Sequence, residues 1–395
     1  MLVGIVGKPN VGKSTFFRAA TLAEAEIAPY PFTTIKANEG VGFVRIECAE
    51  KHFKTICKPK QGFCIDGQRF VPIKLLDVAG LVPGAHAGKG LGNKFLDDLI
   101  QADVLIHIID ASGSTNEKGE IVEAGSYDPI KDIKFLEQEI DAWFSDILKS
   151  SWNKFAKQTG PEKELAIAKH FSGLKINLEM VKNAMKNSNL NKNLRDWSNE
   201  DIVKFARHLR LSSKPIIIAA NKIDLPTAKE NIAKLKKTFP NYLIVPCSAE
   251  SELALREAAK AELIKYIPGD NSFEILQSAK LNEKQKKGLD LIKNILKIWG
   301  SIGVQQCINS AVFDYLKYKV AYPVENANKV SDSKGNILPD AILLPEKATA
   351  KDLAYAVHSS IGDKFVRAID AKTKKVIGKD YILENRAVVE IVTSR

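Results

Sequence analysis

The chain has 395 residues, of which 45% are hydrophobic and 27% are charged, and its formal net charge is +11. This length suggests two or three domains of about 150 residues each, with enough apolar content for buried cores. No apolar run approaches the ~20 residues that a membrane span requires, and no signal-peptide pattern opens the chain. These features favour a cytoplasmic protein without membrane contact.

Charge bears on the kind of partner, and cysteine spacing bears on whether the chain holds disulfides or zinc. The positive charge is spread without a basic tail, so it is compatible with a polyanionic partner such as RNA and equally with a role in solubility alone. The five cysteines contain no C-x-x-C pair: Cys48, Cys57, Cys64, Cys247 and Cys307. Their odd number and scattered positions argue against a disulfide framework and against a zinc site. We therefore expect ordinary reduced thiols.

The opening stretch carries the strongest motif. A short apolar run at residues 2–6, typical of a buried parallel strand, is followed immediately by GKPNVGKS and a helical pattern. This is a complete phosphate-binding P-loop, in which Gly7 and Gly12 let backbone N–H groups point at an anion. Lys13 would contact the β- and γ-phosphates of a nucleotide, and the Ser14 hydroxyl would ligate Mg²⁺.

Two further segments lie where nucleotide switches close over the γ-phosphate and Mg²⁺. The YPFTTI segment contains prolines that exclude a helix, and we assign its second threonine, Thr34, to this contact. The strand-like run FVPIKLL ends in DVAG. Its Asp77 would hold Mg²⁺ through a water molecule, and the Gly80 amide would bond the γ-phosphate.

The position after Gly80 bears on hydrolysis. Leu81 stands where Ras-type switches have a glutamine that orients the attacking water, which a leucine cannot do. Catalysis is then either very slow without a partner or dependent on another group. His86, in a glycine-rich run, is a candidate for orienting the water, and the alternative is an ordinary histidine of a surface loop.

Two more apolar runs, VLIHII and PIIIAA, are predicted to form buried strands. His107 lies in the first and is expected to be a core residue with satisfied hydrogen bonds. The second ends in NKID, where Asp224 would accept hydrogen bonds from the guanine N1–H and exocyclic amine, a pattern that adenine cannot offer. Asn221 would tie this loop to the P-loop, and the Lys222 stem would pack on the base.

A last strand at residues 242–245 leads into CSAE, where the Ala249 N–H would meet guanine O6. The predicted nucleotide-binding residues are Gly7, Asn10, Val11, Gly12, Lys13, Ser14, Thr15, Asn221, Lys222, Asp224, Ser248, Ala249 and Glu250. The predicted metal ligands are Ser14, Thr34 and Asp77, and the predicted catalytic residues are Lys13, Thr34, Gly80 and His86.

The pattern as a whole predicts an α/β protein with several parts. Helical periodicity from residue 128 to 210 is too long for a crossover loop and indicates a helical insertion, for partner docking or for inert support. We expect a P-loop NTPase G domain at 1–127 and 211–265, this insertion at 128–210, a helical segment at 266–313 packing on the G domain, and a small α+β module at 314–395.

The order of motifs also points to a family. The segments GKPNVGKST, YPFTTI, DVAGLVPGAHAGKGLGN, NKID and CSAE resemble the Obg-like translational P-loop GTPases, specifically the YchF-related branch. Residues 324–392 resemble a TGS domain, a ubiquitin-like β-grasp module. The resemblance implies a G domain, a helical domain and a TGS domain, slow intrinsic hydrolysis with a hydrophobic residue matching Leu81, and association with ribosomes or RNA.

The resemblance also implies roles for residues. It assigns phosphate binding to residues 10–15 and Mg²⁺ ligation to Ser14 and Thr34. YchF proteins proper carry N-x-x-E and favour ATP, whereas Asp224 here predicts GTP, as in the related archaeal and eukaryotic subgroup. Asn10 resembles the P-loop asparagine of K⁺-activated GTPases, so K⁺ is a further candidate cofactor.

The resulting hypothesis is a monomeric GTPase switch. Mg·GTP would order the Thr34 and Gly80 loops, and loss of the γ-phosphate would release both and change the angle of the helical and TGS parts. Two alternatives stay open: an ATPase of the YchF kind, and a binding module whose nucleotide is structural. TGS folds often serve as docking elements, so the fold by itself does not establish RNA binding.

Overall fold

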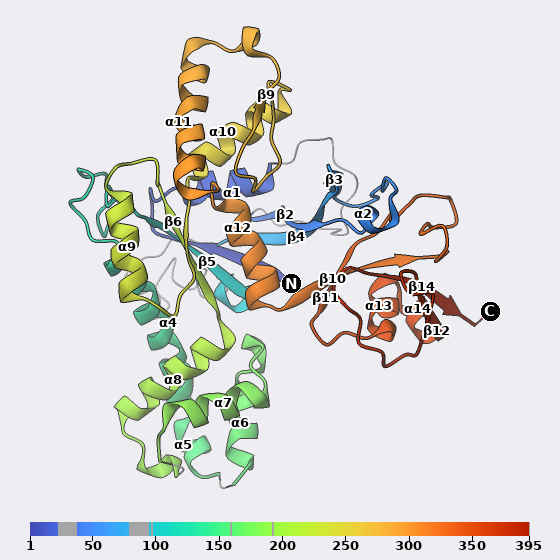
Figure 1. The fold of residues 1–395 in the computed structure, drawn as a ribbon. Helices are drawn as coiled ribbons and strands as arrows, with labels where there is room; N and C mark the ends of the chain where they lie inside the picture. Colours follow the sequence, from blue (N-terminus) through green and yellow to red (C-terminus); the bar gives the residue numbers. More distant parts are fainter. Residues whose placement is uncertain (23–37, 79–94, 96–97, 159, 192, 395) are drawn as a thin grey trace. The chain divides into compact units, whose positions relative to one another are not determined.

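A computed structural model describes the chain except for residues 23–37, 79–94, 96–97, 159, 192 and 395 (Figure 1). Thr34, Gly80, Leu81 and His86 lie outside the described residues, so their roles stay predictions. The described residues group into two compact units, each made of two stretches of chain. The first unit comprises Met1–Phe17 and Leu75–Glu250, and the second comprises Arg18–Lys74 and Ser251–Arg395.

The first unit is built on a parallel sheet. Strand β1 (Leu2–Val6) pairs with β5 (Val104–Asp110), β5 with β6 (Ile216–Asn221), and β6 with β7 (Ile244–Pro246). The end of β4 (Gln68–Asp77) continues this sheet on the other side of β1. Strands β5 and β6 are buried along their whole length, which explains their uninterrupted apolar sequences. The carboxyl ends of the parallel strands, where chemistry is expected, meet at one edge.

The helices between β5 and β6 pack together as a bundle, green in Figure 1. They are α4 (Ile130–Ser150), α5 (Trp152–Ala156), α6 (Glu162–His170), α7 (Leu178–Ser188) and α8 (Asn199–Ser213). Helix α8 begins with a capping box, in which Ser198 and Asp201 satisfy each other's backbone N–H groups. The Trp152 and Trp197 rings stack at 5.3 Å between centroids, so aromatic packing stabilises this bundle.

A buried arginine joins α4 to α8. Arg210 has no exposed side-chain surface, and its Nε donates to Asp141 Oδ1 at 2.6 Å while Nη2 donates to Glu137 Oε1 at 3.2 Å. Tyr242 also donates to Glu137 Oε1, at 2.7 Å. Burial opposes the charge, but Asp141 and Tyr242 outweigh it and raise the pKa of Arg210. The Arg210 guanidinium therefore stays protonated inside the unit.

The second unit begins with antiparallel strands. Strand β2 (Glu39–Glu47) and strand β3 (Phe63–Ile65) lie on either side of the first part of β4. The Phe63 and Phe70 rings stack at 4.5 Å between centroids across β3 and β4. The short helix α2 (Glu50–Phe53) connects β2 to β3.

Other helices and short strands complete the two units. Helix α9 (Ala228–Thr238) lies within the first unit, whereas α1 (Lys13–Thr21) and α10 (Ala249–Lys260) begin in the first unit and end in the second. The second unit also contains β8 (Ile264–Lys265), β9 (Glu274–Ile275), α11 (Glu283–Trp299) and α12 (Val304–Asn309). In the second unit, Arg256 pairs with Glu252 at 2.7 Å and Tyr266 donates to Glu252 at 2.9 Å, all three side chains being buried. This network fixes α10 against the loop that follows β8.

The C-terminal part of the second unit is a five-stranded mixed sheet in the order β11-β10-β14-β12-β13. Its elements are β10 (Tyr318–Val324), β11 (Ile342–Pro345), α13 (Ala350–Val357), α14 (Ser359–Asp363), β12 (Phe365–Asp370), β13 (Val376–Ile377) and β14 (Ala387–Thr393). Leu353 of α13 packs in a core with Leu344 and Val389 of the sheet. The predicted α/β class with a C-terminal α+β module is thus confirmed.

The prediction that His107 is a core residue with satisfied hydrogen bonds was only partly right. It is 2% exposed, as predicted for a buried strand, but its Nδ1 has no hydrogen-bond partner among the described residues. Burial lowers the pKa of His107 to about 3, so the ring is neutral. In the described part of the chain, none of the helices combines the length and apolar content needed to cross a bilayer.

Replacing Arg210 with alanine should lower the free energy of unfolding by about 3–5 kcal/mol, because Asp141 and Glu137, whose side chains are only 15% and 13% exposed, would lose their cation. Arg207→Ala is the matched control on the same helix: its side chain is 58% exposed and 4.0 Å from Glu137, so it should cost less than about 1 kcal/mol. Urea unfolding followed by tryptophan fluorescence measures both. Equal losses for the two variants would contradict a structural role for the buried cluster.

Candidate functional site

A cavity of about 430 Å³ opens at the carboxyl edge of the parallel sheet in the first unit. This volume is typical of small-ligand sites. The cavity is lined by Lys8, Pro9, Asn10, Gly12, Lys13, Ser14, Thr15, Asn221, Lys222, Asp224, Ser248, Ala249 and Glu250. Of the residues predicted to bind nucleotide, Gly7 and Val11 are not in this lining, and Lys8 and Pro9 are additions.

The P-loop connects β1 to α1 as a cradle that excludes side chains. Gly12 has a φ of 93°, and a Cβ there would lie 2.2 Å from Asn221 Nδ2. A Cβ at Gly7 would lie 2.7 Å from the Ile108 carbonyl oxygen. Both glycines are therefore required sterically, which leaves backbone N–H groups and the α1 N-terminus to face an anion.

Asn221 connects three loops at the cavity. Its side chain is buried, Nδ2 donates to the Val11 carbonyl at 2.8 Å, and Oδ1 accepts the Ala249 N–H at 2.9 Å. The predicted tie between the NKID loop and the P-loop is therefore present as a contact. The Ala249 N–H, which we expected to meet guanine O6, is donated to Asn221 instead in this structure. Ser248 Oγ donates to Asp224 Oδ1 at 3.0 Å and so holds that carboxylate.

Lys13 and Asp77 meet where the P-loop joins α1. They form an ion pair between the end of β4 and the start of α1, with 15% and 31% of their side chains exposed. The next residue, Ser14, lines the cavity. A hydroxyl and a carboxylate are the oxygen ligands that suit Mg²⁺, and a lysine beside a helix N-terminus attracts phosphate. Of the predicted metal ligands, Ser14 lines the cavity and Asp77 pairs with the residue before it, whereas Thr34 is not described.

Asp110 is a site residue that the sequence analysis missed. It ends β5, is 1% exposed, and its Oδ2 accepts from Lys222 Nζ at 2.9 Å. Ser112 and Thr115 also donate to this carboxylate, at 2.5 and 3.0 Å. Burial works against ionisation, but the bonds from Ser112 and Lys222 lower the pKa of Asp110. The detectable signal was a carboxylate closing an apolar parallel strand.

Lys8 is a second residue that was missed. It lies in the variable part of the P-loop, yet it is 6% exposed and its Nζ donates to Asp132 Oδ1 of α4 at 2.8 Å. The same Nζ lies 3.9 Å from the centroid of the Tyr127 ring, and Tyr127 donates to Asp132 at 2.9 Å. The P-loop is thereby attached to the first turn of the helical bundle. No sequence pattern marks a lysine at this position as buried.

Asn10, the candidate K⁺ ligand, has its own partner. With a φ of 60°, it donates its Nδ2 to the Gly119 carbonyl at 2.9 Å. This bond occupies the nitrogen of the amide and is compatible with the oxygen serving as a ligand. The K⁺ requirement stays a prediction.

Three family models match successive parts of the chain. A 50S ribosome-binding GTPase model matches residues 2–136, a model for the G4 motif-containing domain of YGR210-like Obg-like GTPases matches residues 219–326, and a TGS domain model matches residues 334–393. The first two cover the P-loop and NKID elements of the cavity, and the third covers most of the five-stranded sheet.

Individual relatives agree with these models. The chain is 48% identical over 395 residues to an uncharacterized GTP-binding protein of Methanocaldococcus jannaschii, with 100% of this chain and 99% of the relative covered. It is 38% identical to a GTP-binding protein of Pyrococcus horikoshii OT3 with a crystal structure, at a TM-score of 0.76 and with 100% of both chains covered. It is 30% identical over 280 residues to Obg-like ATPase 1 of Homo sapiens, covering 67% of this chain and 65% of that protein. Together with the cavity geometry, these matches show that the chain belongs to the Obg-like, YchF-related family of GTP-binding P-loop proteins and carries a TGS domain.

Proposed function

We propose that this protein is a molecular switch that binds Mg·GTP, hydrolyses it slowly and engages the ribosome or its RNA in the cytoplasm. The observation that supports this proposal most is the cavity at the sheet edge, which is lined by the P-loop at one side and the NKID loop at the other. A triphosphate would lie along residues 10–15 and a guanine base beside Asp224.

Base selection would depend on Asp224. Its carboxylate accepts only from Ser248 among the contacts of the described residues, and two further acceptor sites match the N1–H and exocyclic amine of guanine. Adenine offers no donor at either position, so the carboxylate, once covered by the base, would lack a partner at a cost of about 1–3 kcal/mol. Lys222, held by Asp110, would lay its alkyl stem on the base. This chemistry favours GTP over the ATP named for the human relative.

Phosphate and metal binding would use the P-loop side of the cavity. Lys13 would exchange its contact with Asp77 for the β- and γ-phosphates, which frees the carboxylate to hold Mg²⁺ with Ser14 and Thr34. Bound Mg²⁺ would neutralise the charge that develops on the phosphates. Because Leu81 cannot orient water, we expect slow intrinsic turnover, with His86 as the candidate for positioning the water.

The Lys8 contacts provide a route from the nucleotide to the helical bundle. Lys8 lines the cavity and is bonded to Asp132 in α4. A change in the P-loop between nucleotide states would therefore act on α4 directly. The formal charge of +11 and the ribosome-binding GTPase model support a ribosomal or RNA partner. A monomer is the proposed working form.

Asp224→Asn should weaken GTP binding by about tenfold or more, because an amide donor would face the donors of guanine. The same variant should gain affinity for xanthosine triphosphate, whose base has a carbonyl oxygen in place of the amine. Calorimetric titration with the guanosine, adenosine and xanthosine triphosphates measures this, with the exposed Asp66→Asn as control. Equal affinity of the native chain for ATP and GTP would favour the ATPase alternative.

Lys13→Ala should abolish nucleotide binding or turnover, because the phosphates lose their fixed positive charge. Steady-state phosphate release from GTP is the measurement, and Lys236→Ala, an exposed lysine of α9, is the control. Unaltered hydrolysis in Lys13→Ala would refute the site assignment. Absence of turnover in the native chain, with GTP bound, would favour a nucleotide-stabilised binding module.

Co-sedimentation with ribosomal subunits should be stronger with a non-hydrolysable GTP analogue than with GDP, and weaker at higher salt. Comparing the two nucleotides at two salt concentrations tests the switch and the electrostatic contribution separately. The Lys13→Ala variant should show no difference between the two nucleotides. If the native chain sediments equally with both, or with neither, the ribosomal switch is wrong.

A further inference from the structure

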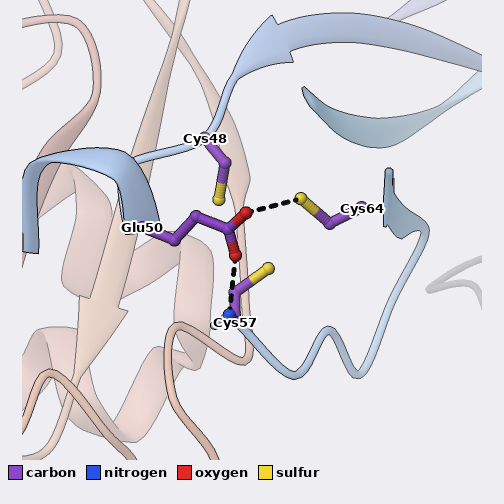
Figure 2. Close-up of side chains that lie close together, drawn as sticks. All are labelled: Cys48, Glu50, Cys57 and Cys64. Atoms are coloured by element: carbon purple, nitrogen blue, oxygen red, sulfur yellow. Dashed lines mark hydrogen bonds between the residues drawn. The ribbon is translucent and has the colours of Figure 1, made fainter. Parts of the chain in front are cut away.

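Three of the five cysteines converge in the second unit, contrary to the scattered arrangement that their spacing suggested. Cys48 follows β2, Cys57 follows α2 and Cys64 lies in β3. Their sulfur atoms and a carboxylate oxygen of Glu50 all lie within 4.8 Å of one another. Figure 2 shows the Glu50 carboxylate between the three sulfurs. The sequence lacks a C-x-x-C pair because each ligand comes from a different element.

The spacing of these atoms fits a small tetrahedral ion. Zinc–sulfur bonds of about 2.3 Å place tetrahedral ligand atoms about 3.8 Å apart. Cys64 Sγ already lies 3.6 Å from Glu50 Oε1. The remaining pairs need to approach by only about 1 Å, a change that side-chain rotation can supply.

The backbone holds the four residues before any ion is present. The Cys48 N–H donates to the Gly67 carbonyl at 2.8 Å, and the Cys57 N–H donates to Glu50 Oε2 at 2.7 Å. Gly62 has a φ of 67°, and a Cβ there would lie 2.0 Å from the Phe70 carbonyl oxygen. The turn into β3 that carries Cys64 is therefore fixed by a required glycine.

A buried cation beside the cluster indicates that the cluster is negatively charged. Arg69 is fully buried, and its Nη1 lies 3.7 Å from Cys57 Sγ and 3.1 Å from the Leu338 carbonyl. Within the described residues it forms no ion pair with a carboxylate, and its Nε has no hydrogen-bond partner. The Leu338 and Pro339 carbonyls accept from this guanidinium but do not neutralise it. A buried charge without a counter-ion is costly, whereas three thiolates and a carboxylate around a divalent ion carry a net negative charge that would compensate it.

A second buried donor faces the same cluster. Tyr322 is fully buried, and its hydroxyl has no hydrogen-bond partner of ordinary geometry among the described residues. This hydroxyl lies beside Cys48, one of the four clustered residues. Donors of this kind stabilise metal-bound thiolates from outside the ligand set.

We propose that Cys48, Glu50, Cys57 and Cys64 bind one Zn²⁺ ion as a closed structural site. Thiolate-rich sets select zinc over magnesium or calcium. With four protein ligands no coordination position is left for a substrate, so the ion is structural rather than catalytic.

The site would secure the contact between this loop and the TGS domain inside the second unit. Directly after Cys57, the Lys58 N–H donates to the Ile337 carbonyl at 2.8 Å and the Lys60 N–H donates to the Pro339 carbonyl at 2.9 Å. Lys60 also pairs with Asp332 at 2.7 Å. A metal that fixes both ends of the loop would hold these contacts in register.

Metal analysis of the purified full-length chain tests the proposal. We expect about one Zn²⁺ per chain, and its loss in Cys57→Ser and in Glu50→Gln. The matched control is Cys307→Ser, because Cys307 is also buried but lies outside the cluster. Replacing zinc with Co²⁺ should give thiolate charge-transfer bands and the visible bands of tetrahedral cobalt, which Cys57→Ser should lack. GTP binding by each variant reports that the nucleotide site still folds.

Removal of the ion should also expose to protease the loop between Cys57 and β3, which carries the contacts of Lys58 and Lys60 with the TGS domain. Re-addition of Zn²⁺ should restore protection. Thiol titration of the denatured, metal-free chain should find all five cysteines reduced. Two fewer thiols would reveal a disulfide and overturn the proposal. Five thiols with no bound metal, or iron with sulfide in place of zinc, would overturn it as well.

Discussion

A single side-chain amide determines the geometry of the nucleotide site. Asn221 bonds the P-loop through one end of its amide and the loop after β7 through the other. Its position also requires the glycine at residue 12, because any Cβ there would collide with the amide nitrogen. The P-loop and the NKID loop are thus parts of one connected structure, in which a buried amide with both ends bonded leaves little freedom to either loop.

Charges around this amide connect the site to the rest of the first unit. Asp110 holds Lys222 from the neighbouring strand end, and Asp132 holds Lys8 from the helical bundle. In each pair a lysine that lines the cavity is anchored by a carboxylate that is almost fully buried. Such pairs are specific in geometry because removal of either partner leaves an uncompensated charge. The lysines are consequently presented to a ligand in fixed orientations.

The sequence alone predicted the parts of this protein that have a local signature, such as an apolar strand or a short motif. Buried parallel strands are apolar without interruption, and the P-loop and NKID segments follow their strand ends, so the sheet and most of the cavity lining could be read directly. Apart from the tie of Asn221 to the P-loop, contacts between distant residues could not. Neither Lys8 with Asp132 nor the three converging cysteines has a local signature, because the partners are brought together by chain folding alone. Ala249 illustrates the same limit, since its amide is used by Asn221.

Neighbouring strands of the parallel sheet are far apart in the chain, and this order affects folding during translation. Strand β1 leaves the ribosome well before its parallel partner β5, which begins at residue 104, and β6 follows only after the whole helical bundle. At about 5–20 residues per second, the apolar β1 waits several seconds during translation for β5 to emerge. The α4–α8 bundle consists of near neighbours in the chain and can form during that synthesis, whereas the nucleotide pocket closes late. The nascent protein should therefore acquire its helical part before it can bind a nucleotide.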